Sequence, residues 1–438
     1  MTITPTAAAL DATVVTVTGG RPLTGRIPVQ GSKNIALHLY AAALLADAPV
    51  VLTGAPDIFD TAVCAQILAH TGAHVVADGG RFTVTPAPAA AVCPIIHPEL
   101  GRRVRTTAVL AAAVLARTGR ADFPYPGGDA FCPRLIDRHL EAMQAAGAEV
   151  TVDAVGIRAR CGPRGVHAFT ADMDTPYGPS LGATVTAMLL AARAPGTSLI
   201  THPSIEPEVT ATAQFLAERG VGIHFDDHGL HVSGSGDLTG GDFTVPGDRI
   251  EAATMIMAAA ATGGSIHLDG ITAAAFPDGL TEALSAAGIS LTDDSSGGVR
   301  AAPASPLQGV EVATGPHPAL PTDTAPQLAA MLTQARGTSL IAERVYPRRD
   351  THVEGLRAFG ADIYSTGAVV GLRGPTRLHS ATAAAADIRA VTALLIAALA
   401  ADGISTIRGV YHLRRGYGHL LANLATLGAD ITTTSEDS

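Results

Sequence analysis

The feature that most constrains the fold of this 438-residue chain is a short phrase that recurs six times. Each copy consists of an apolar helical run, a small residue, a glycine, a small or acidic residue and a β-branched residue. The glycines lie 68 to 75 residues apart, at Gly72, Gly147, Gly220, Gly288, Gly360 and Gly428. Repetition this regular indicates that the chain is built from six similar units.

A second phrase alternates with the first. An Ala- and Leu-rich stretch ends in a short turn, and strand-like alternation of apolar residues follows, at 46–52, 117–123, 194–200, 262–268, 335–341 and 401–407. Glycine in such turns is typical of helix ends. Each unit therefore carries two helices, each followed by a strand. The segments 108–116 and 390–401 are apolar on nearly every face, which predicts buried helices.

Six units are too many for one core and suit two domains of three. We expect an α/β fold with helices inside, sheets outside and a cleft between two similar lobes. The first lobe spans 33–247 and carries the loop at Asp129, and the second spans 1–32 and 248–438. An extended solenoid is the alternative, but solenoid repeats normally have roughly 20–50 residues, fewer than these units have.

Composition excludes several classes of function. The net charge is −10 and no block of Lys and Arg occurs, so nucleic acid is a poor partner. The longest nearly uncharged apolar run, 390–401, is shorter than the ~20 residues of a membrane span, and the N-terminus lacks the features of a secretory signal. We expect a cytoplasmic protein without a membrane partner. Four cysteines without a C-x-x-C pair, and histidines without H-E-x-x-H, predict no metal site.

Charged residues at the ends of predicted elements are the candidate site. Lys33, the only lysine, lies in the sequence GSKN where a strand gives way to a helix, which suits an anion site. A solvated lysine at a helix start is the alternative. The loop 126–134 combines two glycines with Asp129 and Arg134, which suits a mobile lid with a proton donor. The alternative is an ordinary turn with an Asp helix cap.

Acids and arginines also lie at element ends in the second half of the chain. They occur in the segments 316–323, 346–350, 386–389 and 414–417. These segments could converge on one cleft. Taken singly, an arginine is more often a solvated or ion-paired surface group.

Together these segments resemble the enolpyruvyl transferase family, and within it the UDP-N-acetylglucosamine enolpyruvyl transferases of cell-wall synthesis. The similarity runs from about Gly25 to Ile431. It rests on GSKN at 31–34, VRTT at 104–107, PGGDAFCPR at 126–134, SLGAT at 180–184, EPE at 206–208, GDRIEAAT at 247–254, LPTD at 320–323, the segment of Arg349, DIR at 387–389 and RRGY at 414–417. The resemblance implies a two-lobed inside-out α/β barrel of six βαβαββ-type repeats, three per lobe.

The resemblance also implies a reaction: transfer of the enolpyruvyl group of phosphoenolpyruvate to a hydroxyl of a uridine nucleotide, with release of phosphate and without a cofactor. Phosphoenolpyruvate would be bound by Lys33, Arg105, Arg134, Arg349, Arg389 and Arg415. The nucleotide would be bound by Asn34, Arg105, Ser180, Leu181, Gly182, Asp323 and Asp387. Asp323 would take the proton of the acceptor hydroxyl and Asp129 would protonate C3 of phosphoenolpyruvate, with Lys33 and Arg415 completing the catalytic group.

The sequence departs from the family pattern mainly near the acceptor. Asp129 stands where many members carry a Cys, which predicts resistance to fosfomycin-type epoxides. Ile205 replaces an arginine before EPE, Arg414 replaces an acid, and the segment 177–182 lacks a lysine.

These departures favour the 3′-hydroxyl of UMP as acceptor, as in paralogues from nikkomycin- and polyoxin-type peptidyl-nucleoside antibiotic biosynthesis. The alternatives are the 3-hydroxyl of UDP-N-acetylglucosamine in peptidoglycan synthesis, and a non-catalytic sensor of phosphoenolpyruvate or nucleotide. The sequence indicates no particular oligomeric state.

Overall fold

The computed structural model describes residues 13–129, 131, 135–303 and 306–435. Their contacts divide the chain into two compact units. Unit 1 holds the residues up to Gln30 and from Gly247 onward, together with Phe131, and unit 2 holds Gly31–Asp129 and the chain up to Pro246. Apart from the short excursion that carries Phe131, the chain therefore passes from one unit to the other at Gln30–Gly31 and at Pro246–Gly247.

Three inner and three outer helices form the repeats in the described part of unit 2, and the short helix α4 (Pro98–Gly101) precedes the second inner helix. The inner helices are α2 (Lys33–Ala43), α5 (Thr107–Thr118) and α7 (Leu181–Arg193), and the outer helices are α3 (Phe59–His70), α6 (Asp137–Ala145) and α8 (Pro207–Ala217). Its strands form three sheets, in the orders β13(Gly241–Thr244)-β3(Val50–Thr53)-β5(Arg81–Thr85)-β4(His74–Asp78), β6(Arg120–Phe123)-β8(Ile157–Cys161)-β7(Ala148–Val152) and β11(Gly222–Asp226)-β12(Gly229–Ser233)-β10(Thr197–Thr201)-β9(Thr170–Asp172). A parallel bridge from Ile95 to Asp122 stands where the other sheets have their fourth strand.

Unit 1 repeats this plan. Its inner helices are α9 (Arg249–Ala261), α11 (Ala325–Leu332) and α13 (Ile388–Ala400), and its outer helices are α10 (Asp278–Ala286), α12 (Val353–Ala358) and α14 (Leu420–Thr426). Its sheets have the orders β15(Ile289–Asp293)-β16(Gly298–Pro303)-β14(Ser265–Asp269)-β2(Thr24–Pro28), β17(Glu311–Ala313)-β18(Gly337–Ala342)-β20(Val369–Gly374)-β19(Asp362–Ser365) and β21(Thr382–Ala384)-β22(Ile404–Arg408)-β1(Thr13–Thr18)-β23(Asp430–Ser435). In the last sheet β1 pairs antiparallel with β23, so the two ends of the described chain share one sheet.

The six-repeat prediction is confirmed. In each repeat an inner helix leads to a strand and an outer helix follows. An antiparallel hairpin comes next in the first five repeats, whereas in the sixth β23 pairs with β1 from the start of the described chain. Each outer helix is followed by one of the six predicted glycines, whose φ angles all lie between 88° and 101°. A side chain is strained at such angles, so glycine permits the sharp turn from helix to hairpin. The predicted α/β class, with helices inside and sheets outside, is confirmed as well.

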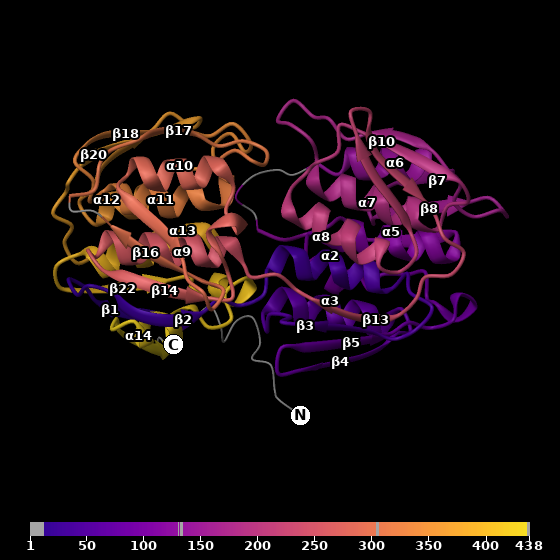
Figure 1. Ribbon diagram of the computed structural model, residues 1–438, viewed down its shortest axis with the longest axis horizontal. Helices are drawn as coiled ribbons and strands as arrows, with labels where there is room; N and C mark the ends of the chain where they lie inside the picture. Colours follow the sequence, from indigo (N-terminus) through magenta and orange to yellow (C-terminus); the bar gives the residue numbers. More distant parts are fainter. Residues whose placement is uncertain (1–12, 130, 132–134, 304–305, 436–438) are drawn as a thin grey trace. The chain divides into compact units, whose positions relative to one another are not determined.

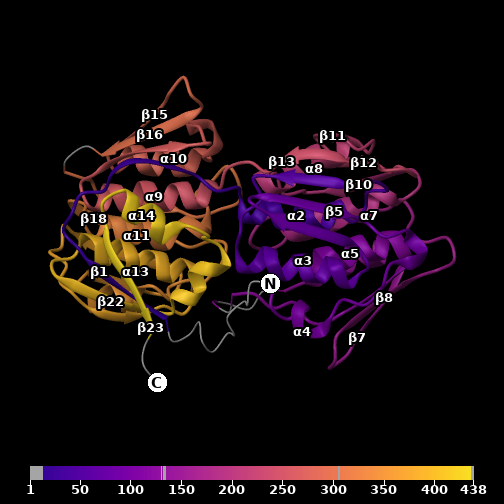
Figure 2. The same cartoon turned by 90° about the horizontal axis from the view of Figure 1, so that it is seen from below.

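The inner helices of unit 1 form its core, as Figures 1 and 2 show for α9, α11 and α13. All thirteen residues of α9 are buried, and α13 is buried from Ile388 to Leu399. Their high Ala content lets neighbouring helices approach closely while strands cover the outside. The predicted burial of 108–116 holds for 107–115 in α5. Among the described residues, no helix combines the length and the hydrophobicity that crossing a bilayer requires.

Candidate active site

Most of the predicted site residues lie at the N-terminal ends of inner helices. In unit 2, Lys33 and Asn34 begin α2, Arg105 lies two residues before α5, and Ser180–Gly182 begins α7. In unit 1, Asp323 lies two residues before α11, and Asp387 and Arg389 lie at the start of α13. A helix N-terminus exposes unpaired N–H groups and the positive end of the helix dipole, so each position can influence bound charge.

Asp323 is held between two arginines in unit 1. Arg349 Nη1 lies 2.7 Å from Oδ1, and Arg389 Nη2 lies 2.7 Å from Oδ2. Burial by itself would raise the pKa of the Asp323 carboxyl, but the charges and hydrogen bonds of Arg389 and Arg349 outweigh it and hold that pKa well below its usual value. The carboxylate is therefore ionised, and it stays a weak base while both arginines remain on it.

Arg389 also joins the three inner helices of unit 1 through Tyr417. Its Nη1 donates to the Tyr417 hydroxyl at 2.7 Å. That hydroxyl lies 3.2 Å from Thr254 Oγ1 of α9 and 3.5 Å from Gln327 Nε2 of α11. Because this cluster is buried, its geometry fixes the direction in which Arg389 presents its other nitrogen to Asp323.

Arg349 is positioned by a loop that Glu343 organises. The Thr322 hydroxyl accepts from Arg349 Nη1 at 3.0 Å and donates to Glu343 Oε2 at 2.8 Å. Glu343 Oε1 also accepts the backbone N–H groups of Val345 and Tyr346, both at 2.9 Å. Nothing in the local sequence marks Glu343, because a lone acid just after a strand belongs to no motif.

An aromatic residue of the predicted lid covers the Arg349 guanidinium. The Phe131 ring centroid lies 4.2 Å from its central carbon, which is cation–π distance. The same ring meets Tyr346 edge-on at 5.3 Å. Phe131 therefore packs against both Arg349 and Tyr346 of unit 1.

Asp387 acts as the N-terminal cap of α13. Its Oδ1 accepts the N–H groups of Arg389 at 2.8 Å and of Ala390 at 2.9 Å, and the Thr351 hydroxyl donates to its Oδ2. This arrangement fixes the first turn of α13 and hence Arg389. Arg415 ends the 3₁₀ helix Val410–Arg415 and is buried in the same unit.

Lys33 forms an ion pair that the sequence analysis missed. Its Nζ lies 3.0 Å from Asp60 Oδ2, and both side chains are largely shielded from solvent. Asp60 lies in the first turn of α3, and Cys64 follows one turn later. Cys64 is fully buried, and burial raises the pKa of its thiol, as expected for a packing residue. Only the fold brings Asp60 to Lys33, since nothing in the local sequence marks it.

The segment around Asp129 is shaped by its two glycines. A Cβ on Gly127 would lie 1.6 Å from the Arg102 carbonyl oxygen, and Gly128 has a φ of 107°. The predicted site residue Arg105 lies three positions after Arg102. Its Nη2 donates to the Leu135 carbonyl at 2.5 Å. Arg134 and Cys132 lie outside the described residues, so the predicted role of Arg134 stays a prediction.

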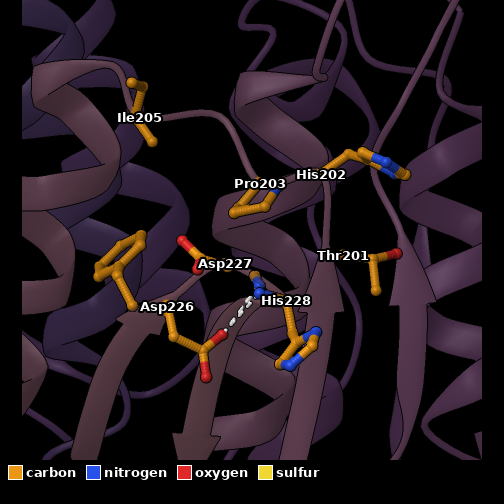
Figure 3. Close-up of a pocket in the computed structure, with 9 residues that line it drawn as sticks. Thr201, His202, Pro203, Ile205, Asp226, Asp227 and His228 are labelled. Atoms are coloured by element: carbon orange, nitrogen blue, oxygen red, sulfur yellow. Dashed lines mark hydrogen bonds between the residues drawn. The ribbon is translucent and has the colours of Figure 1, made fainter.

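A cavity of about 630 Å³ lies beside Ile205, which follows a residue hydrogen-bonded to the first turn of α7 (Figure 3). The Ser180 Oγ accepts the Ala183 N–H and caps α7, while the Thr184 Oγ1 of the same turn accepts the Ser204 N–H at 3.0 Å. Ser204 is followed by Ile205, which is 48% exposed and lines the cavity. The other lining residues come from the end of β10, the segment that follows it and the β11–β12 turn: Thr201, His202, Pro203, Phe225, Asp226, Asp227, His228 and Gly229.

The structure thus groups the predicted residues within each unit. Asp323, Arg349 and Arg389 are in direct contact in unit 1, and Asp387 fixes the turn that carries Arg389. In unit 2 the predicted residues mark three inner helix N-termini. The meeting of Lys33, Arg134 and Arg415 in one site stays a prediction. No three His, Cys, Asp or Glu side chains gather in a metal-binding arrangement within the described parts of the chain.

Comparisons with known proteins agree on one family. Residues 17–424 match the family described as EPSP synthase (3-phosphoshikimate 1-carboxyvinyltransferase). The chain is 36% identical over 424 residues to the UDP-N-acetylglucosamine 1-carboxyvinyltransferase of Hyphomonas neptunium, covering 96% of this chain and 98% of the relative. The enzyme of the same name from Chlorobium limicola is also 36% identical, over 422 residues, covering 95% and 97%.

Solved structures agree in fold. The enolpyruvyl transferase NikO from Streptomyces tendae superposes with a TM-score of 0.85 at 29% identity, covering 97% of this chain and 99% of that one. An EPSP synthase from Acinetobacter baumannii superposes with a TM-score of 0.75 at 17% identity, covering 96% and 100%, which supports the fold alone. A chain with these matches over nearly its whole length belongs to the EPSP synthase family. It is an enolpyruvyl transferase, as the resemblance in the sequence predicted.

Proposed function

We propose that this enzyme transfers the enolpyruvyl group of phosphoenolpyruvate to the 3′-hydroxyl of UMP and releases phosphate. The proposal rests on the absence of acidic side chains from the first turns of the inner helices in unit 2. None of α2, α5 and α7, all fully described, has an acid in its first turn. The caps of α2 and α7 are the neutral hydroxyls of Ser32 and Ser180.

Such helix ends suit anions. Their N–H groups and dipoles attract negative charge, and at the α2 end a ligand would share Lys33 with Asp60, which lies on the neighbouring helix α3. Lys33 and Arg105 add positive charge at two of these ends. Phosphoenolpyruvate and UMP both carry phosphate, so each of them can use such an end. We therefore place the phosphoenolpyruvate phosphate near Lys33 and the nucleotide phosphate near Ser180–Gly182.

Two carboxyl groups would carry the proton transfers. Asp129 would protonate C3 of phosphoenolpyruvate, C2 would become electrophilic, and the acceptor hydroxyl would attack it while losing its proton to Asp323. The resulting tetrahedral ketal would then lose phosphate and a C3 proton, which gives the enol ether. Arg349 and Arg389 would bind the substrate carboxylate, in the bidentate manner that arginine allows.

That last contact bears on the strength of the base. In the ligand-free structure both arginines lie on Asp323 and depress its pKa. A substrate carboxylate that engages the same guanidinium groups would share their charge and raise the basicity of Asp323. Binding of phosphoenolpyruvate would thus prepare the base for the acceptor hydroxyl.

The choice of UMP rests on the surroundings of Ile205. The resemblance implies an arginine at this position in relatives, whereas Ile205 here is apolar and exposed. Its segment is tied to the nucleotide turn by the bond from Ser204 N to Thr184 Oγ1. Loss of a cation beside this turn fits an acceptor with fewer anionic groups than a nucleoside diphosphate. Since the curated relatives at 36% identity are named for UDP-N-acetylglucosamine, that compound is the second candidate acceptor.

Phosphate release tests the proposal directly. The enzyme is incubated with phosphoenolpyruvate and either UMP or UDP-N-acetylglucosamine, and the product is identified by NMR. We expect turnover with UMP and an enol ether at its 3′-oxygen. Turnover with UDP-N-acetylglucosamine alone would select the second candidate. If neither acceptor led to phosphate release, both candidate reactions would be contradicted and the non-catalytic sensor would remain.

A further inference from the structure

Gln30 is the last residue of unit 1 before the chain passes to unit 2, and it lies three residues before Lys33. Its backbone N–H, its backbone carbonyl and both ends of its side-chain amide take part in hydrogen bonds within unit 1. The amide oxygen of this partly exposed glutamine accepts one of these bonds and its amide nitrogen donates another, so the side chain is held at both ends.

The first turn of α9 holds the Gln30 backbone. The Gln30 N–H donates to Glu251 Oε2 at 2.9 Å, and the Gln30 carbonyl accepts the Asp248 N–H at 2.8 Å. Glu251 is only 1% exposed, and its Oε1 has no hydrogen-bond partner among the described residues. Asp248 caps α9 by accepting the Ile250 and Glu251 N–H groups, so the turn that holds Gln30 is itself rigid.

The Gln30 side chain holds a second segment, the turn that follows Arg415. Its Nε2 donates to the Gly416 carbonyl at 2.7 Å, and its Oε1 accepts the Gly418 N–H at 3.0 Å. The residue between the two glycines, Tyr417, is fixed from the other side by Arg389. The turn is therefore clamped on both sides, and Arg415 immediately precedes it.

We propose that Gln30 is a positioning residue that sets the orientation of Arg415 for phosphoenolpyruvate. The proposal rests on the proposed function in one respect, the role of Arg415 as a phosphoenolpyruvate ligand. The two glycines have no side chains with which to anchor the turn, so the glutamine amide supplies the anchor. Because the backbone of Gln30 leads to Lys33, the same residue ties the turn after Arg415 to the segment that enters α2.

Substitutions at Gln30 test this role. Gln30→Met keeps the volume of the side chain and removes both bonds to the turn. Gln30→Glu keeps an acceptor for the Gly418 N–H but sets a second acceptor against the Gly416 carbonyl. The matched control is Gln308→Ala, because Gln308 is an exposed residue of unit 1 whose side chain donates to the Pro306 carbonyl.

Two readouts are taken from the full chain: hydrogen–deuterium exchange of the peptide around Gly416–Gly418, and steady-state kinetics of phosphate release. For Gln30→Met we expect faster exchange of the Gly418 amide. We also expect a rise of roughly tenfold or more in KM for phosphoenolpyruvate, with smaller changes in kcat and in KM for the acceptor. Gln30→Glu should behave like Gln30→Met, and Gln308→Ala like the wild type.

The outcomes separate the two proposals. Wild-type exchange and KM in Gln30→Met would overturn the positioning role, and so would faster exchange with an unchanged KM. A fall in kcat together with equal rises in KM for both substrates would also overturn it, since that result indicates general damage to the fold. Absence of turnover in the wild-type enzyme with either acceptor would count against the proposed function, while the exchange experiment still decides whether Gln30 holds the turn.

Discussion

The two units share one architecture but treat their inner helix N-termini in opposite ways. In unit 1, α9 and α13 are capped by the carboxylates of Asp248 and Asp387, and Asp323 lies just before α11. In unit 2, α2 and α7 are capped by serines, and first-turn acids are absent from its fully described inner helices. Acids at the helix ends thus neutralise the dipoles in unit 1. In unit 2 the caps and first turns of the inner helices carry no acid, and Asp60 of α3 pairs with the Lys33 side chain instead.

Because of this difference, the two units contribute different groups to the proposed reaction. Unit 1 holds its arginines in place with its own acids before any ligand binds, and Asp323 between Arg349 and Arg389 is the clearest case. Unit 2 offers helix ends and Arg105 to anions, together with Lys33, which an anion would share with Asp60. We infer that unit 1 mainly supplies oriented groups for proton transfer and carboxylate binding, and that unit 2 mainly binds phosphate.

The largest effect should come from Asp323→Asn in unit 1. The amide keeps the shape but cannot accept the proton, so turnover should fall by about 10²–10⁴-fold. Phosphoenolpyruvate binding should survive or tighten, because Arg349 and Arg389 lose a competing carboxylate. Phosphate release and direct binding by calorimetry measure the two effects.

A suitable control for that variant is Asp269→Asn, which removes an exposed partner of Arg26 in the same unit and should leave turnover nearly unchanged. If Asp323→Asn kept turnover within tenfold of the wild type, Asp323 would not be the base.

The next prediction concerns Asp129 of unit 2 and fosfomycin-type epoxides. The wild-type enzyme should resist them. An epoxide of this kind is opened by a nucleophilic side chain, and the Asp129 carboxylate is a poorer nucleophile than the thiol that the resemblance implies at this position in many members. Asp129→Cys should introduce time-dependent inactivation with a covalent adduct at that residue, detected by mass spectrometry. An adduct on the wild-type chain would contradict the prediction, and the modified peptide would identify the reactive side chain.

Ser180→Asp converts a cap of unit 2 into the unit 1 type. Asp is at least as good an N-terminal cap as Ser, so the melting temperature should stay level or rise slightly. The new negative charge should raise KM for the nucleotide roughly tenfold, because it opposes phosphate at the α7 N-terminus. Ser180→Thr, which keeps a neutral hydroxyl cap, should bind nucleotide nearly as well as the wild type. Unchanged nucleotide affinity in Ser180→Asp would place the phosphate elsewhere.

The smallest effect should be on stability, at Glu251 of unit 1. Burial, with the nearby Asp248 charge, raises the pKa of Glu251 to about 8 in the folded protein, although the Gln30 N–H bond opposes this shift. The folded state therefore holds a proton that the unfolded state releases near the usual value of 4.5. Stability from this group is fully present below about pH 4.5 and is lost as pH rises toward 8.

Glu251→Gln, which resembles the protonated acid, should flatten the decline in melting temperature between these pH values. Thermal melts of the wild type and the variant from pH 5 to pH 9 test this expectation. Parallel curves for the two proteins would show that Glu251 is already ionised in the folded state.

Much of the fold could be predicted from the sequence, because the repeat is local. A helix that ends at a left-handed glycine and runs into alternating apolar residues is encoded within about twenty positions, and all six predicted glycines have the required φ. The burial of α5 and α13 followed from side chains that are apolar on every face. The candidate site was harder. Asp323, Arg349 and Arg389 were named from motifs, but their mutual contacts depend on three segments separated by dozens of residues.

The sequence by itself determined the repeat, the element types and the charged residues at helix starts, since each depends on residues close together in the chain. Only the tertiary structure decided which charged and polar groups meet: Lys33 with Asp60, Asp323 with two arginines, and Gln30 with the turn after Arg415. The physical reason is that an ion pair or a hydrogen bond depends on distances of a few ångströms. Such distances are set by the packing of several helices at once, and no single segment encodes them.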